Sequence, residues 1–147
     1  MNQEFPIGSE VTVEIETPRF CFVKRRADGG VDFISPFPSL FNYGFLPGTR
    51  AADGDPQDAL LLGRRRARGE RVRGRVEARV RFVDAGECDD KLVCSEGEDG
   101  ALGVRERWAL RAFFTAYATF KRALHALRGR RGRTAYEGIE EGPARVG

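Results

Sequence analysis

Residues 42–63 have the sequence NYGFLPGTRAADGDPQDALLLG, in which three aspartates, Asp53, Asp55 and Asp58, fall within six positions. Carboxylates this close raise one another's pKa unless a cation lies among them. The apolar run ALLLG at 59–63 predicts a short buried strand directly after the last aspartate. The crowded carboxylates therefore indicate a cation site next to a buried strand.

The cation is expected to be a hard divalent ion, but not calcium in an EF-hand loop. Pro56 and Gln57 break the alternation of ligands that such a loop needs, and a strand rather than a helix follows. A second acidic cluster, DAGECDDK, occupies residues 84–91. If strand geometry continues past Asp89, Asp89 and Lys91 point to the same side. Carboxylates without histidine or thiolate select Mg²⁺ or Mn²⁺, which usually bind together with substrate phosphates.

The overall composition is that of one globular domain. The chain has 147 residues, enough for a core of its own. No apolar run approaches the ~20 residues of a membrane span, and residues 1–12 lack the layout of a signal peptide. The three cysteines are odd in number and lack C-x-x-C spacing, which favours reduced thiols. We therefore expect a cytoplasmic protein with no membrane partner.

The hydrophobic pattern predicts an α+β fold, with short strands first and one long helix last. Strands are expected at 11–16, in a hairpin around ADGG at 27–30, at 59–63, within 71–86 and at 90–95. Such a series indicates a small barrel or sandwich. From Val104 to Arg128 apolar residues recur at steps of three and four, which predicts an amphipathic helix.

Three further expectations concern the end of the chain. Residues 1–128 form the predicted single domain, and the Gly- and Arg-rich residues 129–147 are expected to be a loosely ordered tail. Trp108 is expected to be a core or helix-packing residue. His125, the single histidine, lies near the helix end, where it is expected to face solvent or a carbonyl rather than to act in catalysis.

Four segments, in order, resemble the soluble family I inorganic pyrophosphatases. They are VEIETPRFCFVK at 13–24, NYGFLPGTRAADGDPQDALLLG at 42–63, VDAGECDDKLV at 83–93 and FFTAYATFK at 113–121. The D-G-D-P-x-D block after N-Y-G-F is the specific part. The resemblance implies a small closed OB-like antiparallel β-barrel, with one long C-terminal helix and some short helices packed against it.

The resemblance also implies roles for individual residues. The implied magnesium ligands are Asp53, Asp58, Asp84 and Asp89. Asp55 would orient or deprotonate the attacking water. The implied phosphate contacts are Lys24, Tyr43, Lys91 and Tyr117, with Glu16 in support. The implied activity is Mg²⁺-dependent hydrolysis of inorganic pyrophosphate to two phosphates, and the implied partners are this substrate and, in a homo-oligomer, further copies of the chain.

The phosphate-binding side departs from the family pattern. The family's K-Y-E is Lys24-Arg25-Arg26 here, its strand arginine has Ser35 as the nearest candidate, and the lysine after the helix tyrosine is Ala118. Lys121, one turn on from Tyr117, is placed to reach the same region. A second alignment of residues 16–24 puts Cys21 where we place Lys24; we prefer Lys24 because that register needs no gap.

These departures leave two alternatives open. In the first alternative to pyrophosphate hydrolysis, the chain hydrolyses another diphosphate with the same chemistry. In the second, it keeps the scaffold as a basic module that binds nucleic acid or another polyanion. The net charge of +3 and the arginine runs at 64–66 and 128–133 motivate the second alternative. Interleaved aromatic residues are missing from those runs, so we expect no nucleic-acid partner.

Overall fold

The computed structural model describes residues 5–21, 23–25, 31–34, 40–52, 54–96 and 102–141. For 23–25 and 31–34 it describes the backbone alone. Asp53, Ser35 and the side chain of Lys24 therefore lie outside the described part of the protein, and the roles predicted for them stay predictions.

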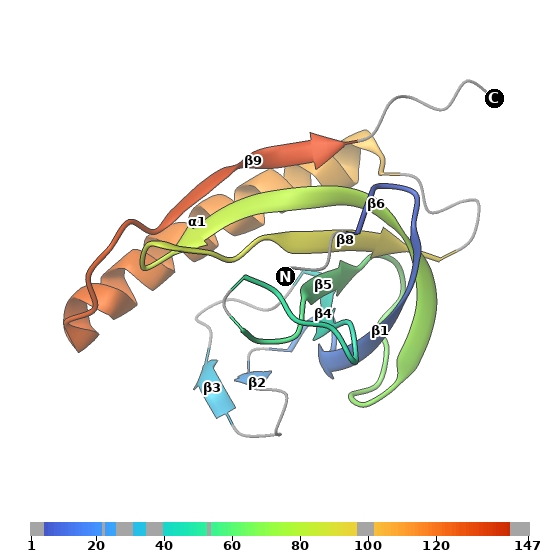
Figure 1. Ribbon diagram of the computed structural model, residues 1–147, viewed down its shortest axis with the longest axis horizontal. Coiled ribbons are helices and arrows are strands. Elements are labelled where there is room, and N and C mark those ends of the chain that lie inside the picture. The colour runs from blue at the N-terminus through green and yellow to red at the C-terminus, as the bar shows by residue number, and fades with distance from the viewer. Residues whose placement is uncertain are drawn as a thin grey trace.

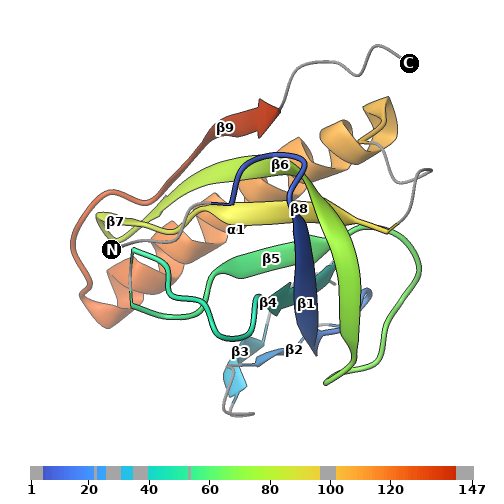
Figure 2. The ribbon, with the colours of Figure 1, turned by 45° about the vertical axis from the view of Figure 1, so that its right-hand side comes forward.

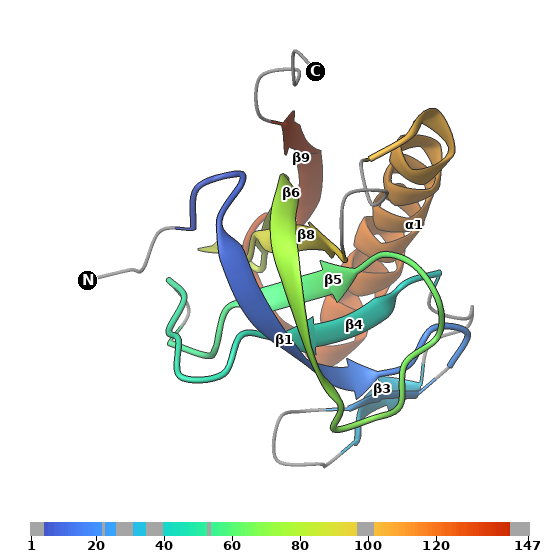
Figure 3. The same cartoon turned by 90° about the vertical axis from the view of Figure 1, so that its right-hand side faces the viewer.

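Five strands close into a ring (Figure 1; Figure 3). Along the ring they are β1 (Glu10–Thr17), β4 (Asn42–Phe45), β5 (Asp58–Leu61), β8 (Lys91–Ser95) and β6 (Arg71–Asp84), and β6 pairs with β1 to complete it. The ring confirms the predicted OB-like barrel. The predicted barrel was wholly antiparallel, and this part of the prediction is wrong, because β5 and β8 run parallel. Their connection is long enough for this, since β6 and the short strand β7 (Glu87–Cys88) lie between them.

The barrel strands carry two sets of buried side chains. On β5, Ala59 and Leu61 belong to a core inside the barrel, whereas Leu60 and Leu62 belong to a second core between the barrel and the helix. β8 alternates in the same way, and all five of its residues are buried. A strand buried on both faces has a continuous apolar run, which is why ALLLG at 59–63 shows no alternation.

Helix α1 (Val104–Arg128) covers the outer face of β6 and β8 (Figure 2). Leu110, Phe114 and Tyr117 are buried in the core that it shares with the barrel. The helix ends at Gly129, whose left-handed φ of 69° suits glycine. Trp108 is exposed, so it does not lie in the core, which was one of the two places expected for it. α1 is the one helix in the part of the chain that the structure describes, and it lacks the combination of length and apolar character needed to cross a bilayer.

Part of the predicted tail forms an ordered strand, β9 (Ala135–Glu141), which pairs with β6. The expectation of a loosely ordered segment is wrong for these residues. Tyr136 and Ile139 pack against the core beneath α1, although they are three residues apart, because the register shifts between Arg81 and Phe82 of β6. This irregularity hides the strand from a period-2 search of the sequence. The predicted hairpin is present as β2 (Val23–Arg25) and β3 (Val31–Ile34).

Candidate active site

The parallel pairing of β5 and β8 brings Asp58 and Lys91 together. Ala59 lies opposite Leu92, so Asp58 and Lys91 begin two neighbouring strands. The Lys91 ammonium donates to Asp58 Oδ2 at 2.6 Å and lies 2.8 Å from Asp89 Oδ2. Asp89 and Lys91 are thus in contact, although Asp89 lies before the first residue of β8 and strand alternation does not account for it. The cation that the crowded carboxylates require is, at Asp58, this lysine.

Lys91 is charged although it is only 1% exposed. Burial acts to lower its pKa, but the negative charges of Asp58 and Asp89 outweigh burial and raise the pKa of Lys91 well above its ordinary value. A buried ammonium between carboxylates is stable only with such partners. The structure therefore holds a permanent positive charge at this point of the barrel.

Two tyrosines lie close to the Lys91 ammonium. The ring centre of Tyr43, on β4, is 5.6 Å from Lys91 Nζ, and Tyr117 of α1 is also near enough to act on the pKa of the lysine. Tyr117 is held by Phe82, whose ring centre is 5.5 Å away, and by Phe113. The structure thus gathers five residues from four segments of the chain: Tyr43, Asp58, Asp89 with Lys91, and Tyr117.

Asp84, at the end of β6, has different partners. His125 Nε2 lies 2.5 Å from Asp84 Oδ1, and Lys121 Nζ lies 3.3 Å from Oδ2. Burial acts to raise the pKa of Asp84, but the hydrogen bond from His125 and the charge of Lys121 outweigh it and lower the pKa. His125 is 5% exposed, so the expectation that it faces solvent or a carbonyl is wrong.

Two further predicted site residues, Asp55 and Glu16, lie in other segments of the chain. Asp55 lies on the exposed turn that follows Ala51, where its carbonyl accepts from the Ala51 N–H at 2.7 Å. Glu16 lies at an irregularity of β1, between Ile15, which pairs with Gly44, and Thr17, which pairs with Tyr43. Glu16 is therefore next in sequence to Thr17, the residue that pairs with Tyr43.

The carboxylates fit a hard divalent ion at Asp58 and Asp89, where oxygen donors from two segments meet at Lys91. Within the described residues, which leave out Asp53, no group of three or more His, Cys, Asp or Glu side chains is arranged to hold a metal. At Asp84 the donor set fits less well, because one oxygen already faces the Lys121 ammonium and the other the His125 imidazole.

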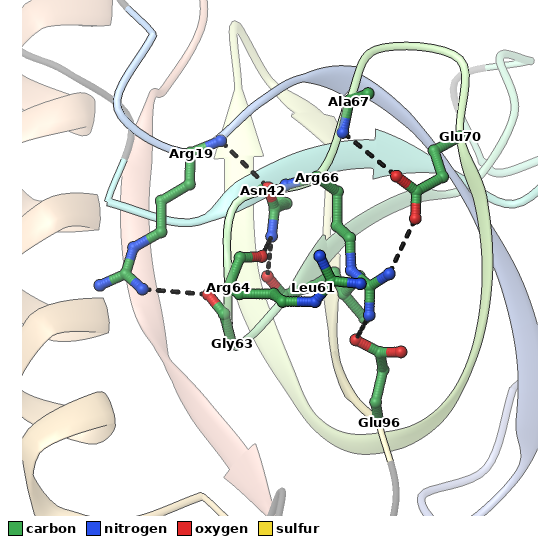
Figure 4. Close-up of polar contacts among 9 residues, drawn as sticks. All are labelled: Arg19, Asn42, Leu61, Gly63, Arg64, Arg66, Ala67, Glu70 and Glu96. Carbon is green, nitrogen blue, oxygen red and sulfur yellow. Dashed lines mark hydrogen bonds and ion pairs between the residues drawn. The ribbon is translucent and has the colours of Figure 1, made fainter.

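Sequence analysis assigned no role to Asn42 or Gln57, the neighbours of two predicted residues. The Asn42 side chain accepts from the backbone N–H groups of Arg19 and Arg66, and donates to the carbonyls of Leu61 and Arg64 (Figure 4). Gln57 donates to the carbonyls of Asp58 and Asp90 at 3.0 and 2.8 Å, which ties the starts of β5 and β8 together. Their position beside Tyr43 and Asp58 is the only signal that the sequence offers.

The fold and the site define a class, an OB-like barrel with a buried lysine between carboxylates. The family model described as inorganic pyrophosphatase matches residues 1–142. An inorganic pyrophosphatase of Haemophilus influenzae is 42% identical over 101 residues, which are 68% of this chain and 54% of that protein. One of Neisseria meningitidis serogroup A is 36% identical over 97 residues, 65% of this chain and 52% of that protein. The chain thus spans about half the length of these curated relatives.

Solved structures agree with this match. An inorganic pyrophosphatase of Neisseria gonorrhoeae has a TM-score of 0.71 at 29% identity, covering 91% of this chain and 83% of that one. One of Coxiella burnetii has the same fold, with a TM-score of 0.74 at 24% identity, covering 95% and 90%. The chain belongs to the inorganic pyrophosphatase family.

Proposed function

We propose that the protein hydrolyses inorganic pyrophosphate to two phosphates with the help of a divalent ion, Mg²⁺ in the first place and Mn²⁺ as a substitute. The observation that carries the proposal is the Lys91 ammonium, buried between Asp58 and Asp89 beside two tyrosines. Such a fixed charge suits phosphoryl oxygens next to ion-binding carboxylates. The membership of the chain in the pyrophosphatase family supports the same reaction.

The residues of the chain divide the reaction between them. Lys91, Tyr43 and Tyr117, with Lys24 from β2, contact oxygens of the diphosphate and hold it in place. Asp55 accepts a proton from the attacking water, whose oxygen bonds to one phosphorus as the bridging P–O bond breaks and its electron pair leaves with the second phosphate. A divalent ion bound here supplies charge neutralisation and lowers the pKa of water. Glu16 supports the site from β1.

Of the four aspartates that the resemblance assigns to metal, we retain Asp53, Asp58 and Asp89 as ligands. Of these, Asp58 is the first residue of β5 and Asp89 lies two residues before β8. The location we propose is the cytoplasm, in line with three cysteines that are free thiols. A homo-oligomer stays a prediction, and light scattering on the purified protein measures it.

The test is phosphate release from pyrophosphate with Mg²⁺. Asp55→Asn and Asp89→Asn should each lose at least about 100-fold in rate, since each removes a charge that the reaction needs. Arg73→Gln is the control, because Arg73 is exposed and pairs with Glu10 on the far side of β1. Equal rates in all four proteins would contradict the proposal.

A second candidate function is hydrolysis of another diphosphate. It is favoured by Ala118, which is buried on α1 where the family has a lysine. ATP and a sugar nucleotide should be assayed beside pyrophosphate, and a higher kcat/KM for either would favour this candidate.

A polyanion-binding role has less support. Four arginines each lie within 3.1 Å of a glutamate, so their positive charge is next to negative charge. They are Arg71, Arg73, Arg81 and Arg107. Binding of a labelled oligonucleotide should therefore be weak and should fall steeply with salt.

A further inference from the structure

Helix α1 carries an ammonium and an imidazole to the carboxylate at the end of β6. Lys121 and His125 are one helical turn apart, and Tyr117 lies one turn before them, so all three face the barrel. Lys121 is 8% exposed and His125 is 5% exposed. Long polar side chains are buried to this extent only with partners, and Asp84 is a partner of both.

The two side chains contact both oxygens of Asp84. Lys121 Nζ is 3.3 Å from Oδ2, and His125 Nε2 is 2.5 Å from Oδ1. A divalent ion on this carboxylate would have to share both oxygens with these groups, and would lie close enough to the Lys121 ammonium for strong repulsion.

The backbone around Asp84 is held as firmly as its side chain. The Ala85 N–H donates to Thr134 Oγ1 at 2.9 Å, and the Gly86 N–H donates to the Arg133 carbonyl at 2.7 Å. Thr134 is buried, and Gly132 lies so close to Ala85 that a Cβ there would be 2.5 Å from its carbonyl. The segment before β9 thus fixes the turn that carries Asp84, and Asp84 stays facing α1.

We propose that Lys121 and His125 stand at Asp84 in place of one divalent ion. Asp84 is then no metal ligand in this chain, and ions bind on the side of Asp58 and Asp89 alone. The inference rests on the proposed function only in requiring that the site binds divalent ions. It changes how the site is built, because part of its positive charge belongs to the protein and is present without metal.

Manganese binding tests this directly. The free Mn²⁺ signal in electron paramagnetic resonance gives the number and affinity of bound ions, with no substrate present. Asp84→Asn should bind as many ions as wild type, with affinity unchanged within about twofold, whereas Asp89→Asn should bind at least about tenfold more weakly or lose an ion. One ion fewer in Asp84→Asn would overturn the proposal, and so would the absence of Mn²⁺ binding in wild type.

The wild-type protein offers a second measurement that needs no folded variant. His125 is the single histidine, so its imidazole nitrogen resonances in NMR are assigned without mutagenesis. With the pair intact, these resonances should keep their positions as Mg²⁺ is added to saturation. A saturable shift would overturn the proposal, since it would show an ion reaching Asp84. Neither measurement depends on turnover, so a protein inactive on pyrophosphate could still bind ions as proposed here.

Discussion

Asp58 Oδ2 and Lys91 Nζ lie 2.6 Å apart, although 33 residues separate them in the chain. The contact follows from the parallel register of β5 and β8, which places Ala59 opposite Leu92 and so aligns the starts of both strands. Asp89, two residues before Lys91, adds the second carboxylate from the same side. One buried cation therefore holds together two segments that carry the proposed chemistry.

Lys91→Met should destabilise the protein by about 3 kcal/mol, because it leaves two partly buried carboxylates without their cation. Urea unfolding in the presence of EDTA measures this loss. Added Mg²⁺ should restore part of the stability, since an ion that binds only the folded state favours it.

The matched control for Lys91→Met is Arg73→Gln, another strand cation paired with a carboxylate. The Arg73 side chain is 79% exposed, so its removal should change the free energy of unfolding by no more than about 0.5 kcal/mol. Equal losses in the two variants would show that burial of Lys91 has no energetic role.

Local patterns were sufficient to predict much of this arrangement. Alternation along 11–16 located β1, and steps of three and four located α1. These features depend on neighbours within a few positions, which the sequence states directly.

Contacts between distant segments could not be predicted in this way. His125 and Asp84 are 41 positions apart, and their contact depends on which face of α1 meets β6. The parallel pairing of β5 with β8 and the addition of β9 to β6 likewise depend on tertiary packing. A histidine near a helix end therefore gave no sign that it would be buried against a carboxylate.

Asn42→Ala should destabilise the protein by about 3 kcal/mol. Asn42 is 0% exposed and makes four hydrogen bonds to backbone groups of the segments around residues 19 and 61–66 (Figure 4), all of which would lose a partner. Asn42→Asp should also be destabilised, because a carboxylate repels the carbonyls of Leu61 and Arg64. Thermal unfolding measures both variants.

Thr119→Ala is the control for Asn42→Ala, since Thr119 is exposed. Its hydroxyl donates a hydrogen bond within α1, to Thr115 O at 3.1 Å. Its unfolding free energy should change by no more than about 0.5 kcal/mol. A loss of unfolding free energy as small as this in Asn42→Ala would mean that the Asn42 side chain is not needed to hold the segments around residues 19 and 61–66 together.

Gly44→Ala should prevent the barrel from closing as it does. A Cβ on Gly44 would lie 1.9 Å from the carbonyl oxygen of Glu14, where β4 pairs with β1. The strands must separate to admit it, which should cost at least about 3 kcal/mol. Gly48→Ala is the comparison, because Gly48 has a φ of +75° but no atom within 4 Å of its Cβ position. Its cost should be the backbone strain alone, about 1 kcal/mol.

Cys94 should resist alkylation in the folded protein, whereas Cys88 should react. Burial, together with the charge of Glu77, raises the pKa of the Cys94 thiol to about 12. At pH 8 only roughly one part in ten thousand is then the reactive thiolate, and the side chain is also fully buried. Cys88 is exposed, and its pKa is raised by partial burial and by Asp90, so its labelling should speed up as the pH rises.

Iodoacetamide labelling followed by intact-mass measurement separates these thiols. Below pH 9 the folded protein should take up label at Cys88 and at the half-buried Cys21, and should gain a third label only in urea. Because the neutral thiol is favoured in the fold, Cys94 contributes to stability below the ordinary thiol pKa, and this contribution is lost as the pH rises from 9 towards 12. Rapid labelling of Cys94 without denaturant would instead mean that β8 separates from β5 and β6 in the native state.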